Sequence, residues 1–390
     1  MKNVTEETMS TENKKMQLSF LHVSDVHLDI PFTGLTAEKS EERRRALRTS
    51  FMNLMKYVRS NGINVVLISG DLFNTEYATN TTAEVLIREF CSCPNTDFII
   101  APGKHDSYNA NPIYTSGRLP ENCHVFSSDK LSRFDFADYN VTVYGWAFMD
   151  GSLRENPLVD RHVDDASRVN IVCAYADLDG STDSDCCPIS TSDIKRFGAD
   201  YYALGSRHEA TDFLAAGASK YAYAGSLECT GFDEPGLGAA NRIIVTYSDG
   251  ELSIECKKLT EEKVRFATER IDITGVDSSN EIVHRISDLV STRGYNSSTA
   301  LRVELTGYVD PRFNAQVATE ASSYGLYYFD LKDKTIPIYG TEGLKRDMSV
   351  KGQIFRSLYD DLVCDDEEKR LVAARALRVA LAALEGRDLP

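Results

Sequence analysis

The 390-residue sequence lacks several features that would assign it to a membrane, secreted or repeat class. It has no apolar run long enough to span a bilayer and no internal repeat. Residues 1–15 are polar without a hydrophobic segment, so we expect a flexible tail over residues 1–16 rather than a signal peptide. With 42% hydrophobic and 26% charged residues, the chain is expected to be a globular, cytoplasmic protein without a membrane partner.

The nine cysteines follow neither a disulfide framework nor a zinc-binding pattern. Cys91 and Cys93 lie close together, as do Cys186 and Cys187, and both pairs could bind metal. Neither has a second Cys or His pair at the spacing of a zinc site. We therefore expect ordinary free thiols.

Positive charge is also scarce, and the net charge of the chain is −16. Proteins that grip DNA over a wide surface normally carry a basic stripe that displaces counterions. The only dense basic run here is Arg43, Arg44 and Arg45 with Arg48, which is either a solvated helix face or a phosphate contact. Any binding of DNA by this chain alone is expected to be weak and salt-sensitive.

Four apolar segments each end in a polar cluster. Such short runs predict buried strands, and ligand sites of open α/β sheets lie beyond the carboxyl ends of their strands. Asp25 and His27 stand two residues apart, so on an extended segment both would face one divalent ion. The four exits are Asp25 and His27, then Gly70 and Asp71, then Gly103 to Asp106, then Gly205 to His208.

The remaining pattern predicts an α/β fold. A helix is expected from Glu38 to Ser60, and further strands and helices predict two packed sheets with helices outside, a four-layer sandwich over residues 17–260. A change of pattern near Glu261 predicts a small α+β domain over residues 261–345 and helices over 346–390. Residues 333–352 are expected to be irregular, and Asp365 or Asp366 to cap the last helix, which Gly386 ends.

The four strand exits, in this order, resemble those of the calcineurin-like metallophosphoesterase superfamily. Within it, the chain resembles the SbcD and YhaO-type DNA repair exonuclease subunits, which implies an αββα sandwich, a capping domain and a C-terminal partner-binding segment. The stretches that carry this second likeness are Tyr201–Gly205, Gly225–Leu227, Gly231–Gly236, Leu301–Gly307 and the helix ending at Ala383–Arg387.

The resemblance also implies a set of metal ligands. In this family two ions, usually manganese, share a bridging Asp and activate a water that attacks a DNA phosphodiester. The first ion would be held by Asp25, His27, the bridging Asp71 and His208. His105 matches the histidine that protonates the leaving group.

The second ion's ligands are largely missing from the sequence. Lys104 stands where the family has Asn, Ser206 where it has His, and Tyr175 where a further His is expected. Lys104 would repel a second dication. It could instead pair with Asp71, bind a substrate phosphate or point to solvent. We therefore expect one ion, of the manganese type.

Three functions remain open at this point. The chain is a metal-dependent DNA exonuclease (a hydrolase) with reduced activity, a pseudoenzyme that serves as a structural or DNA-positioning subunit, or a small-molecule phosphodiesterase. The resemblance implies docking of the C-terminal helices on the coiled coil of an SMC-like ATPase, and a homodimer is also compatible with it. The last helix carries an apolar stripe that either docks in this way or packs on the chain's own capping domain; its members are Leu371, Ala374, Leu377, Leu381 and Leu384.

Overall fold

The computed structural model describes residues 16–181, 184–234, 238–248, 251–260, 264–276, 278–309, 324–337 and 341–384. They fall into two compact units, one within Met1–Thr230 and Leu237–Glu261, the other within Gly231–Gly236 and Glu262–Pro390. The predicted tail up to residue 15 and the predicted helix end at Gly386 lie outside the described residues.

The first unit begins with a six-stranded sheet of order β14-β13-β1-β2-β3-β4. Its parallel core is β1 (Met16–Val23), β2 (Val65–Ile68), β3 (Asp97–Ile100) and β4 (Cys123–Val125). Strands β13 (Ala240–Ser248) and β14 (Glu251–Leu259) pair antiparallel, and β13 also runs antiparallel to β1. The crossover helices are α1 (Ala37–Ser60) and α2 (Asn80–Cys91), and the short α3 (Pro112–Thr115) follows β3.

The second sheet has the order β11-β12-β10-β7-β6-β5. Its strands are β5 (Ser132–Phe136), β6 (Val141–Gly145), β7 (Val169–Tyr175), β10 (Tyr201–Gly205), β11 (Leu214–Ala216) and β12 (Ser219–Tyr223). Strands β5 and β6 pair antiparallel and are connected by the 3-10 helix η1 (Ala137–Tyr139). Helix α4 (Thr191–Phe197) is capped by Ser190 and ends at Gly198. The short strands β8 (Asp177–Leu178) and β9 (Pro188–Ile189) precede this helix in the sequence and pair with each other.

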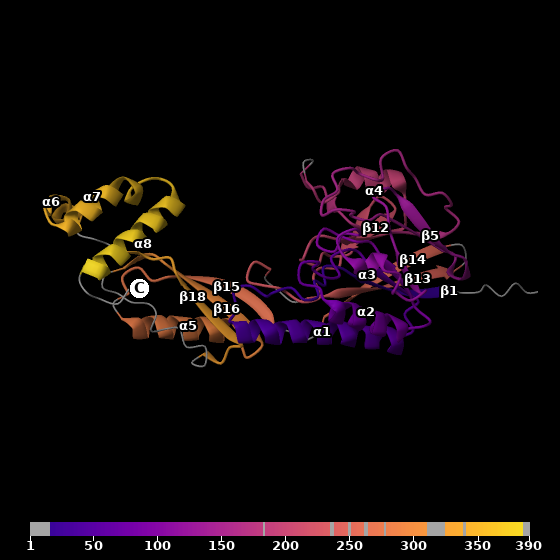
Figure 1. Ribbon diagram of the computed structural model, residues 1–390, viewed down its shortest axis with the longest axis horizontal. Helices are drawn as coiled ribbons and strands as arrows, with labels where there is room; N and C mark the ends of the chain where they lie inside the picture. The colour runs from indigo at the N-terminus through magenta and orange to yellow at the C-terminus, as the bar shows by residue number, and fades with distance from the viewer. Residues whose placement is uncertain are drawn as a thin grey trace, which may run out of the picture. The chain divides into compact units, whose positions relative to one another are not determined.

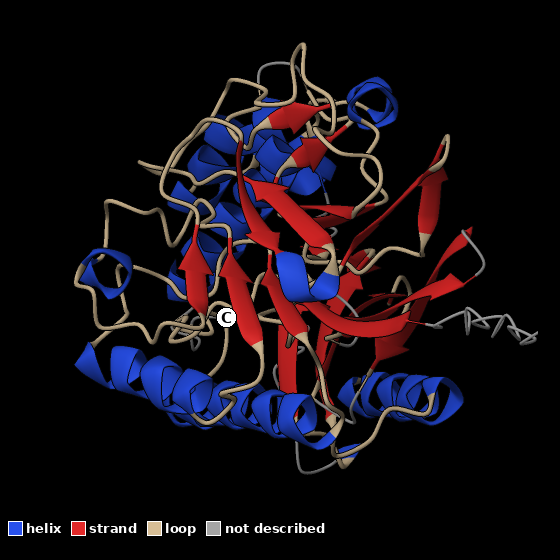
Figure 2. Cartoon of the chain, turned by 90° about the vertical axis from the view of Figure 1, so that its right-hand side faces the viewer, coloured by secondary structure: helices blue, strands red, loops and turns tan. Residues whose placement is uncertain are grey.

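Three hydrophobic clusters show that this unit has four layers. Successive strand residues point to opposite faces, so Phe20 packs between the two sheets, whereas Leu21 packs toward the outer helices. Residues of α1 and α2 cover the outer face of the first sheet, and Ile194 and Phe197 of α4 pack on that of the second. Figure 1 shows α4, the two sheets and α1 with α2 in this order, and Figure 2 shows helices outside the strands. The predicted αββα sandwich is confirmed.

The second unit contains three parallel strands in the order β15-β16-β18. These are β15 (Arg265–Asp272), β16 (Thr299–Thr306) and β18 (Tyr328–Asp333), and α5 (Ser279–Arg293) buries Ile282 and Ile286 in their core. The prediction of an irregular stretch over residues 333–352 is wrong. This stretch contains α6 (Thr341–Arg346), the start of α7 (Val350–Leu362) and β19 (Ile336–Pro337). Strand β19 pairs with β17 (Tyr308–Val309). These elements are too short to show a clear period in the sequence.

Helix α8 (Glu367–Leu384) buries the middle of its predicted apolar stripe within the chain. Leu377 and Leu381 pack with Phe355 of α7, whereas Leu384 is half exposed. The predicted cap is Asp366, whose Oδ1 accepts hydrogen bonds from the backbone N–H groups of Glu368 and Lys369. The opposite face of α8 leaves Val372 and Val379 exposed.

Two of the expected absences can be compared with the structure. Within the described ranges, no helix has the length and apolarity needed to cross a membrane. All nine cysteines lie in these ranges and are free.

Candidate metal centre

The side chains predicted to hold the first ion converge beyond the carboxyl ends of β1, β2 and β10. His27 Nε2 lies 3.1 Å from His208 Nε2 and 3.8 Å from Asp71 Oδ2. His208 Nε2 lies 3.7 Å from Asp25 Oδ1. Asp25, His27 and His208 each offer one ligand atom, and these three atoms all lie within 4.8 Å of one another. Two imidazole nitrogens and two carboxylates thus surround one small volume.

The backbone brings these groups together in a way that differs from the prediction. Asp25 and His27 are not extended, because their φ angles are +49° and +51°, and Asp71 has φ +51°. The two loops are instead tied by backbone hydrogen bonds from Asp25 N to Gly70 O (3.0 Å) and from His27 N to Asp71 O (2.9 Å). Left-handed backbone at a non-glycine residue is unfavourable, and such conformations cluster at functional sites.

Two buried carboxylate oxygens of this group fit a bound cation. Asp25 Oδ1 and Asp71 Oδ2 are buried and, among the described residues, accept no hydrogen bond. Burial raises the pKa of Asp25 to about 6 and that of Asp71 to about 6, and the nearby His208 opposes the shift in both. A buried charge without a partner is costly, and a divalent ion would supply one. Oxygen and imidazole ligands together suit Mn, Fe or Zn.

A hydrogen bond and burial prepare the His27 ring to bind a metal ion. His27 Nδ1 donates to Asn74 Oδ1 (2.8 Å), which turns the Nε2 lone pair toward the carboxylates. Burial lowers the pKa of His27 to about 4, so its ring is neutral at neutral pH, as a metal ligand must be. Asn74 was not among the predicted site residues, although its position three residues after Asp71 is a usable signal.

Asp106 is a second residue that the sequence analysis gave no role. Its carboxylate accepts hydrogen bonds from Asp71 N (3.1 Å), Leu72 N (2.8 Å) and Gly103 N (2.6 Å), and from the Tyr114 hydroxyl (2.6 Å). It therefore joins the loop after β2 to the loop after β3. Its position directly after His105 is the signal that could have identified it.

His105 lies at the exposed rim of the group. Its ring centroid is 5.3 Å from that of His27, and its backbone N–H donates to Asp71 Oδ1 (2.8 Å). Partial burial is the largest cause that lowers the pKa of its imidazole. The His105 side chain can thus approach a substrate from the solvent side, while the backbone N–H of the same residue orients the Asp71 carboxylate.

Tyr175 fills the space beside Asp71. A Cβ atom added to Gly70 would lie 2.3 Å from Tyr175 Cδ2, and one added to Gly103 would lie 2.8 Å from the same atom. The ring packs edge-on against Phe148. Tyr175, which stands where a histidine was expected, therefore covers Gly70 and Gly103 beside Asp71.

Lys104 and Ser206 are turned to other partners. Lys104 Nζ binds both carboxylate oxygens of Asp185 at 3.0 Å, so its partner is Asp185 and not the predicted Asp71. Ser206 Oγ donates to Ala176 O (2.9 Å). Among the described residues, Asp25, His27 and His208 form the one group of three His, Cys, Asp or Glu side chains close enough for an ion. Lys104 and Ser206, bonded to these other partners, add no ligands for a second ion.

Similarities to known proteins accompany this geometry. Residues 18–206 match the family model of the calcineurin-like phosphoesterases. The chain is 25% identical over 301 residues to the uncharacterized metallophosphoesterase YhaO of Bacillus subtilis (strain 168), covering 74% of this chain and 72% of the relative. It is 24% identical over 294 residues to the DNA double-strand break repair protein Mre11 of Thermoplasma acidophilum, covering 70% and 72%. A solved dimetal phosphatase from Danio rerio aligns with a TM-score of 0.38 and 13% identity, over 62% of this chain and 98% of that one.

Proposed function

We propose that the protein, whose residues 18–206 match the family model of the calcineurin-like phosphoesterases, acts on DNA phosphodiesters with one manganese-type ion. The observation that carries the proposal is the pair of buried, unsatisfied oxygens on Asp25 and Asp71, which face the nitrogens of His27 and His208. DNA as the substrate is supported by the relative described as a DNA double-strand break repair protein.

The residues of the site have separate tasks in this proposal. A divalent ion bound there would polarise a phosphoryl oxygen and lower the pKa of a water. Asp25, His27, Asp71 and His208 hold it, and Asn74 and Asp106 orient the ligands from behind. His105 protonates the leaving oxygen. Because the pKa of His105 is lowered, only a minor fraction of this side chain carries a proton at neutral pH.

Turnover should be well below that of a two-ion enzyme. A second ion would clamp both the attacking and the leaving oxygens. Tyr175, Lys104 and Ser206 offer no equivalent, since each is packed against or bonded to another group. The same observation favours a second candidate from a different class, a DNA-positioning subunit that binds but does not cleave. We propose slow hydrolysis as the first of the two.

Mn-dependent cleavage of linear DNA and of a generic phosphodiester, measured together with calorimetric titration of Mn, tests the proposal. We expect one bound ion, lost in His27→Ala, and slow cleavage that is lost in His105→Ala while Mn binding persists. Binding of Mn and DNA without cleavage would favour the positioning subunit. Two equally tight ions in the native protein would contradict the one-ion site.

We further propose that the C-terminal helices dock on an SMC-like ATPase. The centre of the predicted stripe is buried against α7, so a docking surface must use other residues. Val372, Ala376, Val379 and Ala383 lie at helical spacing and are all exposed, which gives α8 a second apolar face. A partner that supplies the DNA-binding surface would also suit a chain of net charge −16.

A further inference from the structure

A pocket of about 430 Å³ lies between the first half of α1 and the loops that follow β1 and β2. Asp29 on its wall is two residues beyond His27, so their Cα atoms are at most about 7.6 Å apart. Tyr77 on another wall is three residues beyond Asn74, which holds the His27 ring. The pocket is therefore next to the metal centre along both loops.

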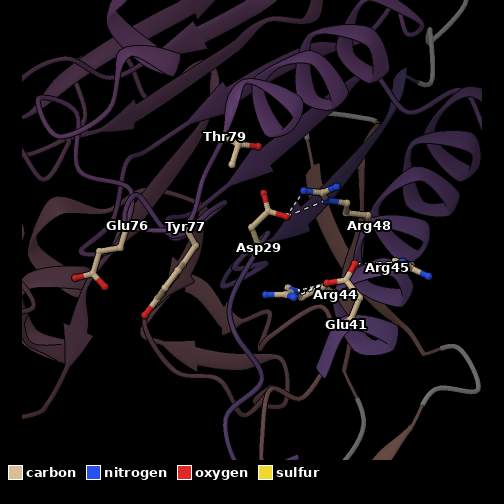
Figure 3. Close-up of a pocket in the computed structure, with 8 residues that line it drawn as sticks. All are labelled: Asp29, Glu41, Arg44, Arg45, Arg48, Glu76, Tyr77 and Thr79. Carbon is tan, nitrogen blue, oxygen red and sulfur yellow. Dashed lines mark hydrogen bonds and ion pairs between the residues drawn. The ribbon is translucent and has the colours of Figure 1, made fainter. Parts of the chain in front are cut away.

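The arginines of α1 form the positive wall of this pocket (Figure 3). Arg44 binds Glu41 through Nε (3.1 Å) and Nη2, and Arg45 binds the same carboxylate through Nε (3.2 Å). Arg48 binds the buried Asp29 through Nε (2.8 Å) and Nη2. With Glu76, the lining contains three guanidiniums and three carboxylates, so the pocket has no net charge and its arginines act through their free N–H groups.

These ion pairs orient the guanidiniums without using all of their donors. A guanidinium carries five N–H donors in a rigid fork, and the bonds to Glu41 and Asp29 engage one or two groups of each side chain. The remaining edges can bind a phosphate with two parallel hydrogen bonds. Arg44 and Arg48 can therefore make the phosphate contact that the sequence left open for this basic run, whereas Arg43 is buried against Glu228.

Tyr77 provides a different kind of surface in the same pocket. Its side chain is 43% exposed, although a tyrosine ring is usually largely buried. In Figure 3, Arg44 extends toward Tyr77, while Arg45 and Glu76 point away. An exposed aromatic ring facing a guanidinium matches the two halves of a nucleotide, because bases stack on aromatic side chains and phosphates bind Arg.

We propose that this pocket is a nucleotide subsite that holds a flanking nucleotide of a DNA strand, with its phosphate on Arg44 and Arg48 and its base on Tyr77. The inference rests on the proposed function for DNA as the ligand. It adds the residues that hold the strand beside the metal centre, in a chain that is otherwise strongly acidic.

Fluorescence anisotropy with a labelled single-stranded oligonucleotide, without metal and between about 50 and 200 mM KCl, tests the subsite. Arg44→Gln should reduce the steepness of log K against log salt by about 0.7. Tyr77→Ala should weaken binding roughly five-fold or more and leave the slope unchanged. Arg44→Lys should keep the slope, because it keeps the charge, and lose affinity through the missing fork.

Matched variants control for charge and for exposed aromatic area. Arg196→Gln removes an arginine that forms an i,i+3 ion pair with Asp193 on α4, in the opposite outer layer of the sandwich. Tyr247→Ala removes a ring of the same 43% exposure on β13. Both should bind the oligonucleotide like the native protein.

Each remaining outcome counts against a defined part of the inference. If the native protein binds the oligonucleotide and the pocket variants bind equally well, or the control variants weaken binding as much, the subsite is wrong and the proposed function stands. If the native protein does not bind the oligonucleotide, the subsite is wrong, and the Mn-dependent cleavage and Mn titration described above decide the proposed function separately. Calorimetric titration of Mn should give the same stoichiometry in all these variants, and its loss in a pocket variant would show damage to the metal centre instead of a subsite.

Discussion

At the level of single residues, the buried carboxyl of Asp25 should make the stability of the protein depend on pH when no metal ion is bound. It is fully buried, and burial raises its pKa to about 6. Its protonated form is therefore favoured in the folded state relative to the unfolded chain, where the pKa is about 3.9. Between these two pH values the folded state binds more protons than the unfolded state, so the contribution of Asp25 to the stability of the metal-free protein falls as the pH rises.

Asp25→Asn should accordingly stabilise the metal-free protein. At pH 7.5 the gain in free energy of unfolding should be roughly 1–3 kcal/mol, because the substitution removes a buried charge. Mn should stabilise the native protein and fail to stabilise the variant. Urea denaturation in EDTA and in Mn measures both effects, and Asp212→Asn, at an exposed position, is the control. A variant less stable than the native protein in EDTA would contradict the electrostatic account.

Tyr175 is the residue whose replacement should most directly reopen a second ion site. The triple change of Tyr175→His, Lys104→Asn and Ser206→His removes the ring that covers Gly70 and Gly103 and restores three ligands. Calorimetry should then detect a second, weaker Mn, since position 206 keeps a left-handed backbone with φ +105°. Cleavage should rise roughly ten-fold or more, equivalent to at least about 1.4 kcal/mol of transition-state stabilisation.

Two single changes separate the parts of that result. Tyr175→Phe keeps the ring over the glycines and removes the hydroxyl, so it should leave the stoichiometry at one ion. Lys104→Asn alone should also leave it at one, because Lys104 is bonded to Asp185 and not to Asp71. A second ion in either single variant would show that the ring does not close the site.

The sequence predicted which residues would gather at the strand exits, because an apolar run that ends in polar residues marks the end of a buried strand. It did not predict how they gather. The left-handed backbone of Asp25, His27 and Asp71 depends on hydrogen bonds between two loops, and the bonded residues are 45 and 44 positions apart in sequence. The partner of Lys104 is likewise a loop residue, Asp185, and no local pattern specifies such a pair.

At the level of elements, α1 links the first sheet to the segment that follows β12. Arg43 and Glu228 form an ion pair in which both side chains are almost fully buried, and Ser50 also donates to Glu228. Arg43 in addition lies over the Phe32 ring. A buried pair of this kind adds little net stability, but the loss of one partner leaves a buried charge.

Arg43→Met should therefore lower the free energy of unfolding by about 3–5 kcal/mol. Adding Glu228→Gln should recover part of this loss, because the isolated charge is then removed. Arg45→Met, at a mostly exposed position of the same helix, should change stability by no more than about 0.5 kcal/mol. Denaturant unfolding measures all three, and equal losses in the two arginine variants would show that helix propensity, not the buried pair, is responsible.

The elements that the sequence predicted well are those with a long, regular apolar period. Helix α1 follows its predicted range within one residue because six of its side chains are buried at helical spacing. Helix α6 and strand β19 were missed because six and two residues are too few to show any period. Their positions depend on packing within the second unit, which a local pattern does not record.

At the level of the whole molecule, the charge of −16 argues against a protein that holds long DNA by itself. The resemblance to SbcD-type subunits would resolve this through an ATPase partner with its own DNA-binding surface. Mutations in helix α8 can test whether such a partner binds this chain. Its buried face maintains the packing on α7, and its exposed face is available for a partner.

The double change Val372→Glu and Val379→Glu should leave the chain folded, because these side chains are 65% and 36% exposed. It should abolish co-purification with the SMC-like ATPase, since two charges would have to be buried in the interface. Leu377→Glu should instead unfold the C-terminal helices, because Leu377 is fully buried against Phe355. Glu367→Lys, at an exposed position of the same helix that lies off this face, is the charge control and should keep the partner. Undiminished co-purification of the double variant, with circular dichroism matching the native chain, would show that the ATPase binds elsewhere.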